Sequence, residues 1–239
     1  MDEPIKSDGR PDDPHGTLVT YAVLAGLTPL IPIPFVDDLA KDYFRKHLVN
    51  VLAESRRVSL PRGAVDALTA ERQGCLVGGC LGQILIYPLK KLFTKLFFFL
   101  EWKRVLDLTS QTYHFGYLVD CALAEGYLAG PRARSIDEVR LAIEAVCREA
   151  PIRPVESAVA ATFRQSRAVL SGAVEEFASR FRETAGRGKR ARVEATLDAV
   201  EAQERRQVAG VAEALQDRLK AVPDAHFQSL RQQLRRRLG

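Results

Sequence analysis

Cysteine is scarce in this chain of 239 residues, and none of its four cysteines forms a CxxC pair. Cys75, Cys80, Cys121 and Cys147 are too few and too irregularly spaced for a disulfide framework. The four histidines are equally scattered, so we expect no zinc site built from local ligand pairs. The composition therefore predicts no metal site and is typical of a protein from a reducing compartment.

Signatures of catalysis are also missing. The patterns GxSxG, HExxH and GxGxxG do not occur, and neither do kinase signatures. Residues 186–190 read GRGKR, but a phosphate-binding loop would need Gly and Ser or Thr where Glu183 and Arg190 stand. His114 and Cys121 fall two turns apart on one predicted helix, too far to share a proton directly. We expect no enzyme, no catalytic residue and no cofactor.

Period-two alternation of apolar and polar residues is absent, which favours an all-α fold, a helical bundle. One predicted helix follows Asp37 or Asp38 as its N-cap and places Tyr43, Leu48 and Leu52 on one face. The run Ser135-Ile-Asp-Glu138 predicts a capping box. The spacing of apolar residues predicts helices over 101–128, 135–149, 155–181 and 192–221, with a short Arg-rich helix after Pro223.

Charge is missing from two stretches, residues 17–36 and 73–89. About 20 apolar residues can cross a bilayer as a helix, so each run is a candidate transmembrane helix. Pro29, Pro32 and Pro34 predict that a helix in the first run ends or kinks near Thr28. We predict that the two runs form an apolar helical hairpin in the N-terminal half. The expected membrane or packing residues are Leu30, Ile31, Phe35, Gly78, Gly79, Phe97 and Phe98.

The first run carries a recognisable motif, Ile31-Pro32-Ile33-Pro34 followed by Asp37. It resembles a motif of bacterial helical membrane-hairpin domains of unknown function that are associated with Era-like GTPases. The resemblance covers residues 17–100 and rests on this one short motif. It implies membrane association and a GTPase as protein partner, and it supplies no catalytic residues.

The composition changes along the chain, and this predicts three parts. Residues 1–16 are rich in acidic and turn-forming residues, the opposite of a signal peptide, and predict a disordered leader. Before residue 128 lie 14 of the 18 aromatic residues, which favours an apolar helical domain over 17–130. Residues 121–239 hold 21 basic and 16 acidic side chains, and an amphipathic helical domain is predicted over 131–239.

The C-terminal end is basic. Residues 180–239 contain 14 basic and eight acidic side chains, and four arginines cluster at the end: Arg231, Arg235, Arg236 and Arg237. Such a cluster predicts weak binding to an anionic surface by charge alone, without sequence-specific recognition of nucleic acid. A solvated terminus is an equally good interpretation.

Two functions remain open from these patterns. The first is a membrane-associated, non-catalytic scaffold or adaptor at the cytoplasmic face of a bacterial inner membrane, with lipid as partner. The alternative is a soluble, cytoplasmic all-α protein-interaction module whose two apolar runs form one core. The basic residues flanking the runs are balanced and predict no orientation. The sequence predicts no oligomeric state.

Overall fold

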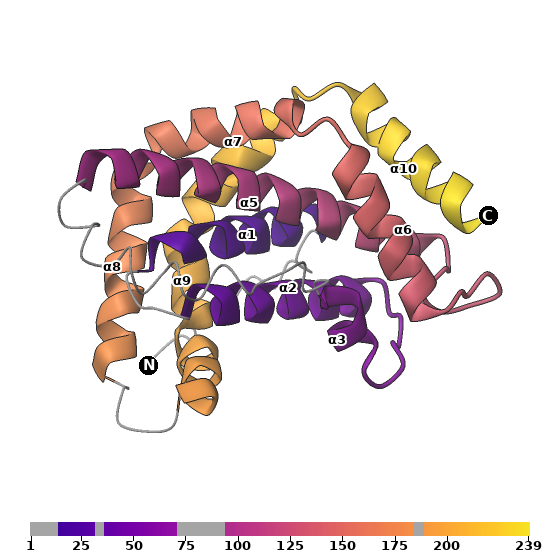
Figure 1. Cartoon of the computed structure of the whole chain (residues 1–239), viewed down its shortest axis with the longest axis horizontal. Helices are drawn as coiled ribbons and strands as arrows, with labels where there is room; N and C mark the ends of the chain where they lie inside the picture. Colours follow the sequence, from indigo (N-terminus) through magenta and orange to yellow (C-terminus); the bar gives the residue numbers. More distant parts are fainter. Residues whose placement is uncertain (1–13, 32–35, 71–93, 184–188) are drawn as a thin grey trace, which may run out of the picture.

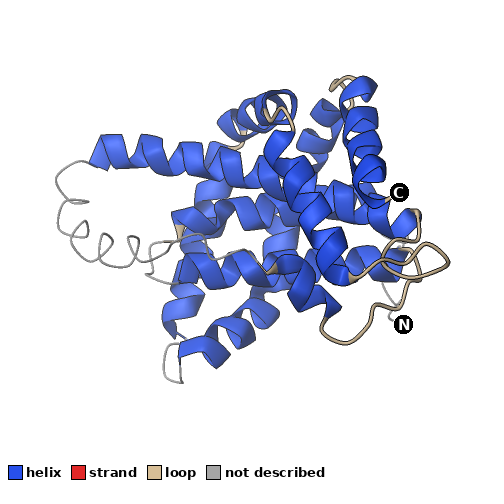
Figure 2. Cartoon of the chain, turned by 45° about the vertical axis from the view of Figure 1, so that its right-hand side comes forward, coloured by secondary structure: helices blue, strands red, loops and turns tan. Residues whose placement is uncertain are grey.

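The regular structure is entirely helical in the part of the chain that the computed structural model describes, residues 14–31, 36–70, 94–183 and 189–239. Figure 2 shows helices and connecting turns over these residues, without a strand. The predicted all-α class is therefore confirmed. Of the predicted leader over 1–16, residues 1–13 lie outside the described residues, and the prediction of disorder is wrong for 14–16, which form the start of a helix.

The first apolar run forms the central helix, α1 (Pro14–Leu27), followed by a short 3-10 turn, η1 (Thr28–Leu30). Every residue from Tyr21 to Thr28 is buried. A helix that is apolar all round has to be covered all round. The covering helices are α5 (Thr94–Ala124), α2 (Val36–Ser55) and α9 (Lys189–Leu219), and Figure 1 shows α1 between α5 and α2 with α9 crossing them.

The prediction of a transmembrane helix is wrong for the residues that the structure describes. None of their helices is both long enough and apolar enough to cross a membrane. The helix of the first run has only 14 residues, a length of about 21 Å against a hydrocarbon core of about 30 Å. It ends at Leu27 because Pro29 follows, as the proline pattern predicts.

The predicted hairpin residues are only partly described. Ile31 is buried and Leu30 is partly buried against the same core. Phe35, Gly78 and Gly79 lie outside the described residues, as does the whole second run. Phe97 and Phe98 belong to α5, but their side chains are not described. Packing of the two runs against each other therefore stays a prediction.

The next helix, α2, buries the face that its spacing predicts, including Tyr43, Leu48 and Leu52. The predicted N-cap is wrong, because α2 begins at Val36 and both Asp37 and Asp38 lie inside its first turn. After residues 61–63 a short helix, α3 (Ala64–Thr69), returns along α2. The end of α2 is tied to α5 by Arg56, whose Nε and Nη2 each donate to an Asp120 carboxylate oxygen at 2.6 Å.

The prediction of one continuous helix over 155–181 is wrong, because this segment forms two helices. Helix α7 (Arg153–Gln165) ends at Ser166, and α8 (Arg167–Glu183) leaves in a different direction (Figure 1). Ser166 has φ −100° and ψ 14°, outside the helical range. The bend lets Phe163 pack beside Trp102 of α5, with ring centroids 6.2 Å apart, while α8 packs on α9.

The capping box that opens α6 (Ile136–Glu149) is confirmed. The Glu138 backbone N–H donates to Ser135 Oγ at 3.2 Å, and the Ser135 N–H donates to Glu138 Oε2 at 3.1 Å. The last helix, α10 (Asp224–Leu238), buries Leu230, Leu234 and Leu238 against α6 and α5. The buried cluster includes residues on both sides of residue 130, so the two predicted halves share one core.

Candidate functional site: the junction of α5 and α10

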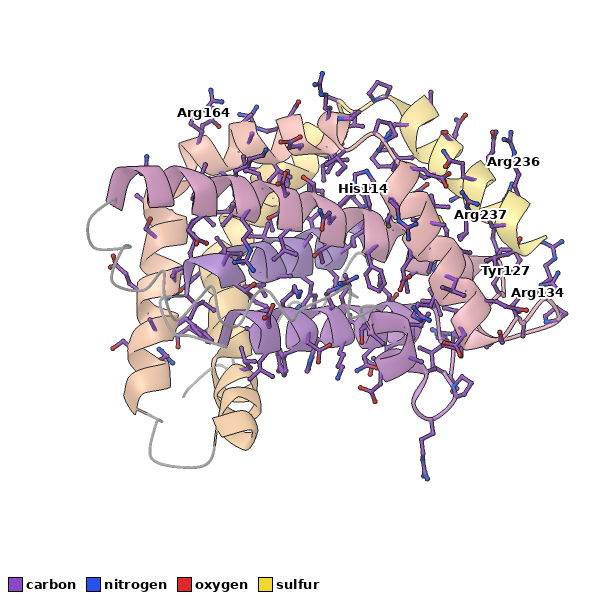
Figure 3. The ribbon with its side chains drawn as sticks, in the orientation of Figure 1. His114, Tyr127, Arg134, Arg164, Arg236 and Arg237 are labelled. Carbon is purple, nitrogen blue, oxygen red and sulfur yellow. The ribbon has the colours of Figure 1, made fainter. Side chains whose placement is uncertain are left out.

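Two histidines meet where α10 begins to pack on α5. His114 Nε2 lies 3.0 Å from His226 Nε2, although the residues are 112 positions apart in the chain. The His114 ring is only 2% exposed, and its Nδ1 lies 2.7 Å from the Ser110 carbonyl oxygen one turn earlier. Figure 3 shows His114 on α5 close to the start of α10. The pair is therefore a partly buried polar contact between two helices that also pack through apolar residues.

Hydrogen-bond chemistry fixes the protons of this pair when both rings are neutral. A carbonyl oxygen can only accept, so the proton of His114 sits on Nδ1 and its Nε2 carries a lone pair. His226 Nε2 must then be the donor to His114 Nε2. In the neutral pair, His226 therefore donates to His114, and His114 donates to the Ser110 carbonyl oxygen.

Aromatic rings enclose the histidine pair. The Phe227 ring lies 5.2 Å from Tyr117 and 6.2 Å from Tyr113, and the Tyr117 hydroxyl donates to the Phe227 carbonyl oxygen at 3.3 Å. The Tyr113 hydroxyl oxygen also lies 3.4 Å from Nε2 of His15 in α1. Burial raises the pKa of both tyrosines, that of Tyr117 to about 12, so both hydroxyls stay protonated at neutral pH.

Burial makes both imidazoles weaker bases. It lowers the pKa of His114 to about 4, with a smaller effect from the neighbouring His226 and an opposing one from the Ser110 carbonyl. Burial also lowers the pKa of His226, which is less deeply placed. Both rings are consequently neutral at physiological pH, which is the state that the hydrogen-bond order above requires.

The low pKa of His114 predicts that acid destabilises the fold. An unfolded His114 takes a proton near pH 6.5, whereas the folded one resists it until about pH 4, where its pKa lies. The stabilisation is complete above pH 6.5 and is lost as the pH falls through this window. We expect about 3 kcal/mol less free energy of unfolding at pH 4 than at pH 8 from this group. Urea unfolding followed by circular dichroism measures it.

A His114→Gln variant isolates this effect from the common acid response of the carboxylates. The free energy of unfolding of wild type minus that of the variant should fall by about 3 kcal/mol from pH 8 to pH 4. Parallel pH curves for the two proteins would contradict a role for His114 in this loss.

Further along α10, three of the four predicted anionic-surface arginines pair with carboxylates of the chain itself. Arg235 Nε lies 2.8 Å from Glu125 Oε2, and Arg231 Nε lies 3.8 Å from Glu125 Oε1. Arg237 Nη2 lies 2.5 Å from Glu149 Oε2 of α6. Arg236 is exposed on the same helix. The four arginines are still largely accessible, so their binding to an anionic surface remains a prediction.

A groove of about 520 Å³ separates the C-terminal end of α10 from α6. Its lining combines apolar residues with charged ones: Arg134, Glu138, Leu141, Ala142, Ala145, Arg237, Leu238 and Gly239. The Leu141 side chain is 39% exposed, one of two large apolar residues with this exposure in the described part of the chain. Arg134 Nε donates to the Leu238 carbonyl oxygen at 3.0 Å, which fixes one rim.

Sequence reasoning missed both features. The sequence excluded a direct proton transfer between His114 and Cys121, but it gave no hint that His226 contacts the buried His114 across the chain. Cys121 is buried, and burial raises its pKa, so its thiol stays protonated. In the described ranges no group of three or more His, Cys, Asp or Glu side chains is arranged to hold a metal ion.

Comparison with known proteins found no match to this chain among family models, curated proteins or solved structures.

Proposed function

We propose that this chain is a non-catalytic all-α protein-interaction module that binds an acidic amphipathic helix in the groove between α6 and α10. The observation that carries the proposal is the groove itself, in which an exposed Leu141 lies among small apolar residues and between arginines. Grooves of this kind take the apolar face of a helix, with charges at the rim selecting the partner.

The charge of the rim favours an acidic occupant. Arg134 and Arg237 line the groove, and the exposed Arg236 adjoins Arg237 on α10 (Figure 3). Glu138 is the acidic side chain of the lining, and it is already engaged in the capping box of α6. A partner helix with acidic residues flanking its apolar face would meet these arginines, in competition with Glu138 of the lining and with Glu149, which already pairs with Arg237.

The burial of α1 supports a protein partner over lipid. The first apolar run is the part of the described chain best suited to a bilayer, and its residues from Tyr21 to Thr28 are enclosed by the chain's own helices. The absence of chemistry at the junction supports a non-catalytic role, because His114 and His226 bind each other and burial raises the pKa of Cys147 to about 12.

Site-specific photo-crosslinking tests this proposal. A benzoylphenylalanine placed at Leu141 should form a defined adduct in the native cells, and mass spectrometry should map it to an acidic amphipathic segment of a protein. The same residue at Val169 of α8, which is 49% exposed, is the matched control and should give no such adduct.

Charge reversal completes the test. Arg236→Glu should weaken the adduct at position 141 by about tenfold if one rim charge pair contributes about 1.4 kcal/mol. Equal adducts at positions 141 and 169, an adduct unaffected by Arg236→Glu, or an adduct with lipid would each contradict the proposal. The last of these would favour membrane association instead.

A further inference from the structure

The contact between His114 and His226 responds to two added protons in different ways. The first proton can enter at His226 Nδ1, because His226 Nε2 is already the donor and its bond to His114 Nε2 is kept. The second proton has to enter at His114 Nε2, because His114 Nδ1 already carries one for the Ser110 carbonyl. Two N–H groups then face each other across 3.0 Å, with a positive charge on each ring.

We propose that His114 and His226 form a two-proton latch, which holds the start of α10 on α5 with one added proton and releases it when both imidazoles are protonated. The latch follows from the geometry of the pair and does not depend on the proposed partner. Release of α10 would also affect binding of the proposed partner, because α10 forms one wall of the groove.

The surroundings of the pair favour release on double protonation. Titratable and charged groups lie around the junction on the packed elements: Tyr113, Tyr117 and Cys121 on α5, His15 on α1, and Asp224 and Arg231 on α10. Within the described chain, the charge that acts on the pKa of His114 is that of His226, and no carboxylate raises the pKa of either ring. Neither ring therefore has a carboxylate as a direct counterion for the second positive charge in the described chain.

The start of α10 has few other polar ties to α5. Past the histidines, the Tyr117 hydroxyl bonds the Phe227 carbonyl, and the ion pairs of Arg231 and Arg235 with Glu125 lie further along the helix. Loss of the histidine pair therefore frees the first turns of α10, while the arginine pairs act at its other end. Release of these turns is a local opening and leaves the core around α1 in place.

Hydrogen exchange of the full chain tests the latch. Peptides covering residues 223–234 are followed by mass spectrometry from pH 7.5 to pH 4.5, with rates corrected for the pH dependence of intrinsic exchange. We expect the protection of these amides to fall by at least about tenfold at pH 4.5, while peptides of α1 keep theirs. The double variant His114→Gln/His226→Gln cannot take either proton, and its protection should change less than about twofold.

Two single variants serve as controls for this experiment. His47→Gln removes a histidine of α2, outside the α5–α10 junction, and should keep the wild-type response. His226→Gln retains an amide donor to His114 Nε2, and it serves as the second variant if the double one fails to fold; its α10 protection should persist at pH 4.5. An acid loss in the double variant or in His226→Gln that equals the loss in wild type, or no loss in wild type, would overturn the latch. Protection of α10 by stoichiometric Zn²⁺ in wild type would also overturn it, in favour of a metal site.

Discussion

Replacing Val23 with lysine is expected to destroy cooperative folding. Val23 is fully buried in α1 and has neighbouring helices on every side. An ammonium group placed there has no carboxylate partner, and an unpaired buried charge costs several kcal/mol, a large fraction of the 5–15 kcal/mol that holds a typical domain. We expect a loss of at least about 5 kcal/mol. Urea unfolding monitored by circular dichroism would then show no folded baseline.

Val169→Lys is the matched control for this variant. Val169 lies on α8 and is 49% exposed, so the same substitution should change the free energy of unfolding by less than about 0.5 kcal/mol. A Val23→Lys protein with an unchanged urea midpoint would mean that α1 is not enclosed by its own chain. The burial argument for a protein partner would then fail with it.

Replacing Gly26 with valine is expected to cost about 4 kcal/mol, above the usual range for an overpacked core. Gly26 marks a close approach of α1 to α5. A Cβ atom built there would lie 1.8 Å from Thr109 Oγ1, 2.9 Å from its Cβ and 3.1 Å from its Cα. The hydroxyl could move, but the Cα belongs to the backbone of α5 and cannot retreat without separating the helices. Thermal and urea unfolding measure the loss.

The contact with Thr109 can be tested separately by a double-mutant cycle. Thr109→Ala removes the nearest atom, so the pair Gly26→Val/Thr109→Ala should be about 1–2 kcal/mol more stable than the sum of the single changes predicts. Gly210→Ala in α9 is the control, because nothing lies within 4 Å of its Cβ position. It should stabilise the protein by about 0.5–1 kcal/mol through helix propensity. Additive effects of Gly26 and Thr109 would show that the two helices do not meet there.

Local signals in the sequence predicted local features well. The capping box of Ser135 and Glu138 could be predicted from the sequence because both of its hydrogen bonds form within one turn. The end of α1 could be predicted because Pro29 cannot continue an α-helix. The break at Ser166 was missed because the apolar spacing from Val155 to Phe177 continues through it, and only tertiary packing distinguishes one long helix from two.

The candidate site could not be predicted, because its contacts join distant parts of the chain. His114 meets His226 across 112 residues and Arg56 meets Asp120 across 64. An apolar run of 20 residues is equally compatible with a bilayer and with the interior of a bundle, since both environments exclude water. The covering of α1 in the structure comes in part from α9, which begins about 160 residues after α1 ends and cannot be read from the run itself.

That covering has a consequence for synthesis on the ribosome. At 5–20 residues per second, α1 waits about 10–30 s between its own translation and that of α9. During this time α2 and α5 can shield only part of a helix that is apolar all round. Nascent chains stopped before residue 189 would therefore expose α1 and should depend on chaperones, whereas chains that have completed α9 can close the core themselves.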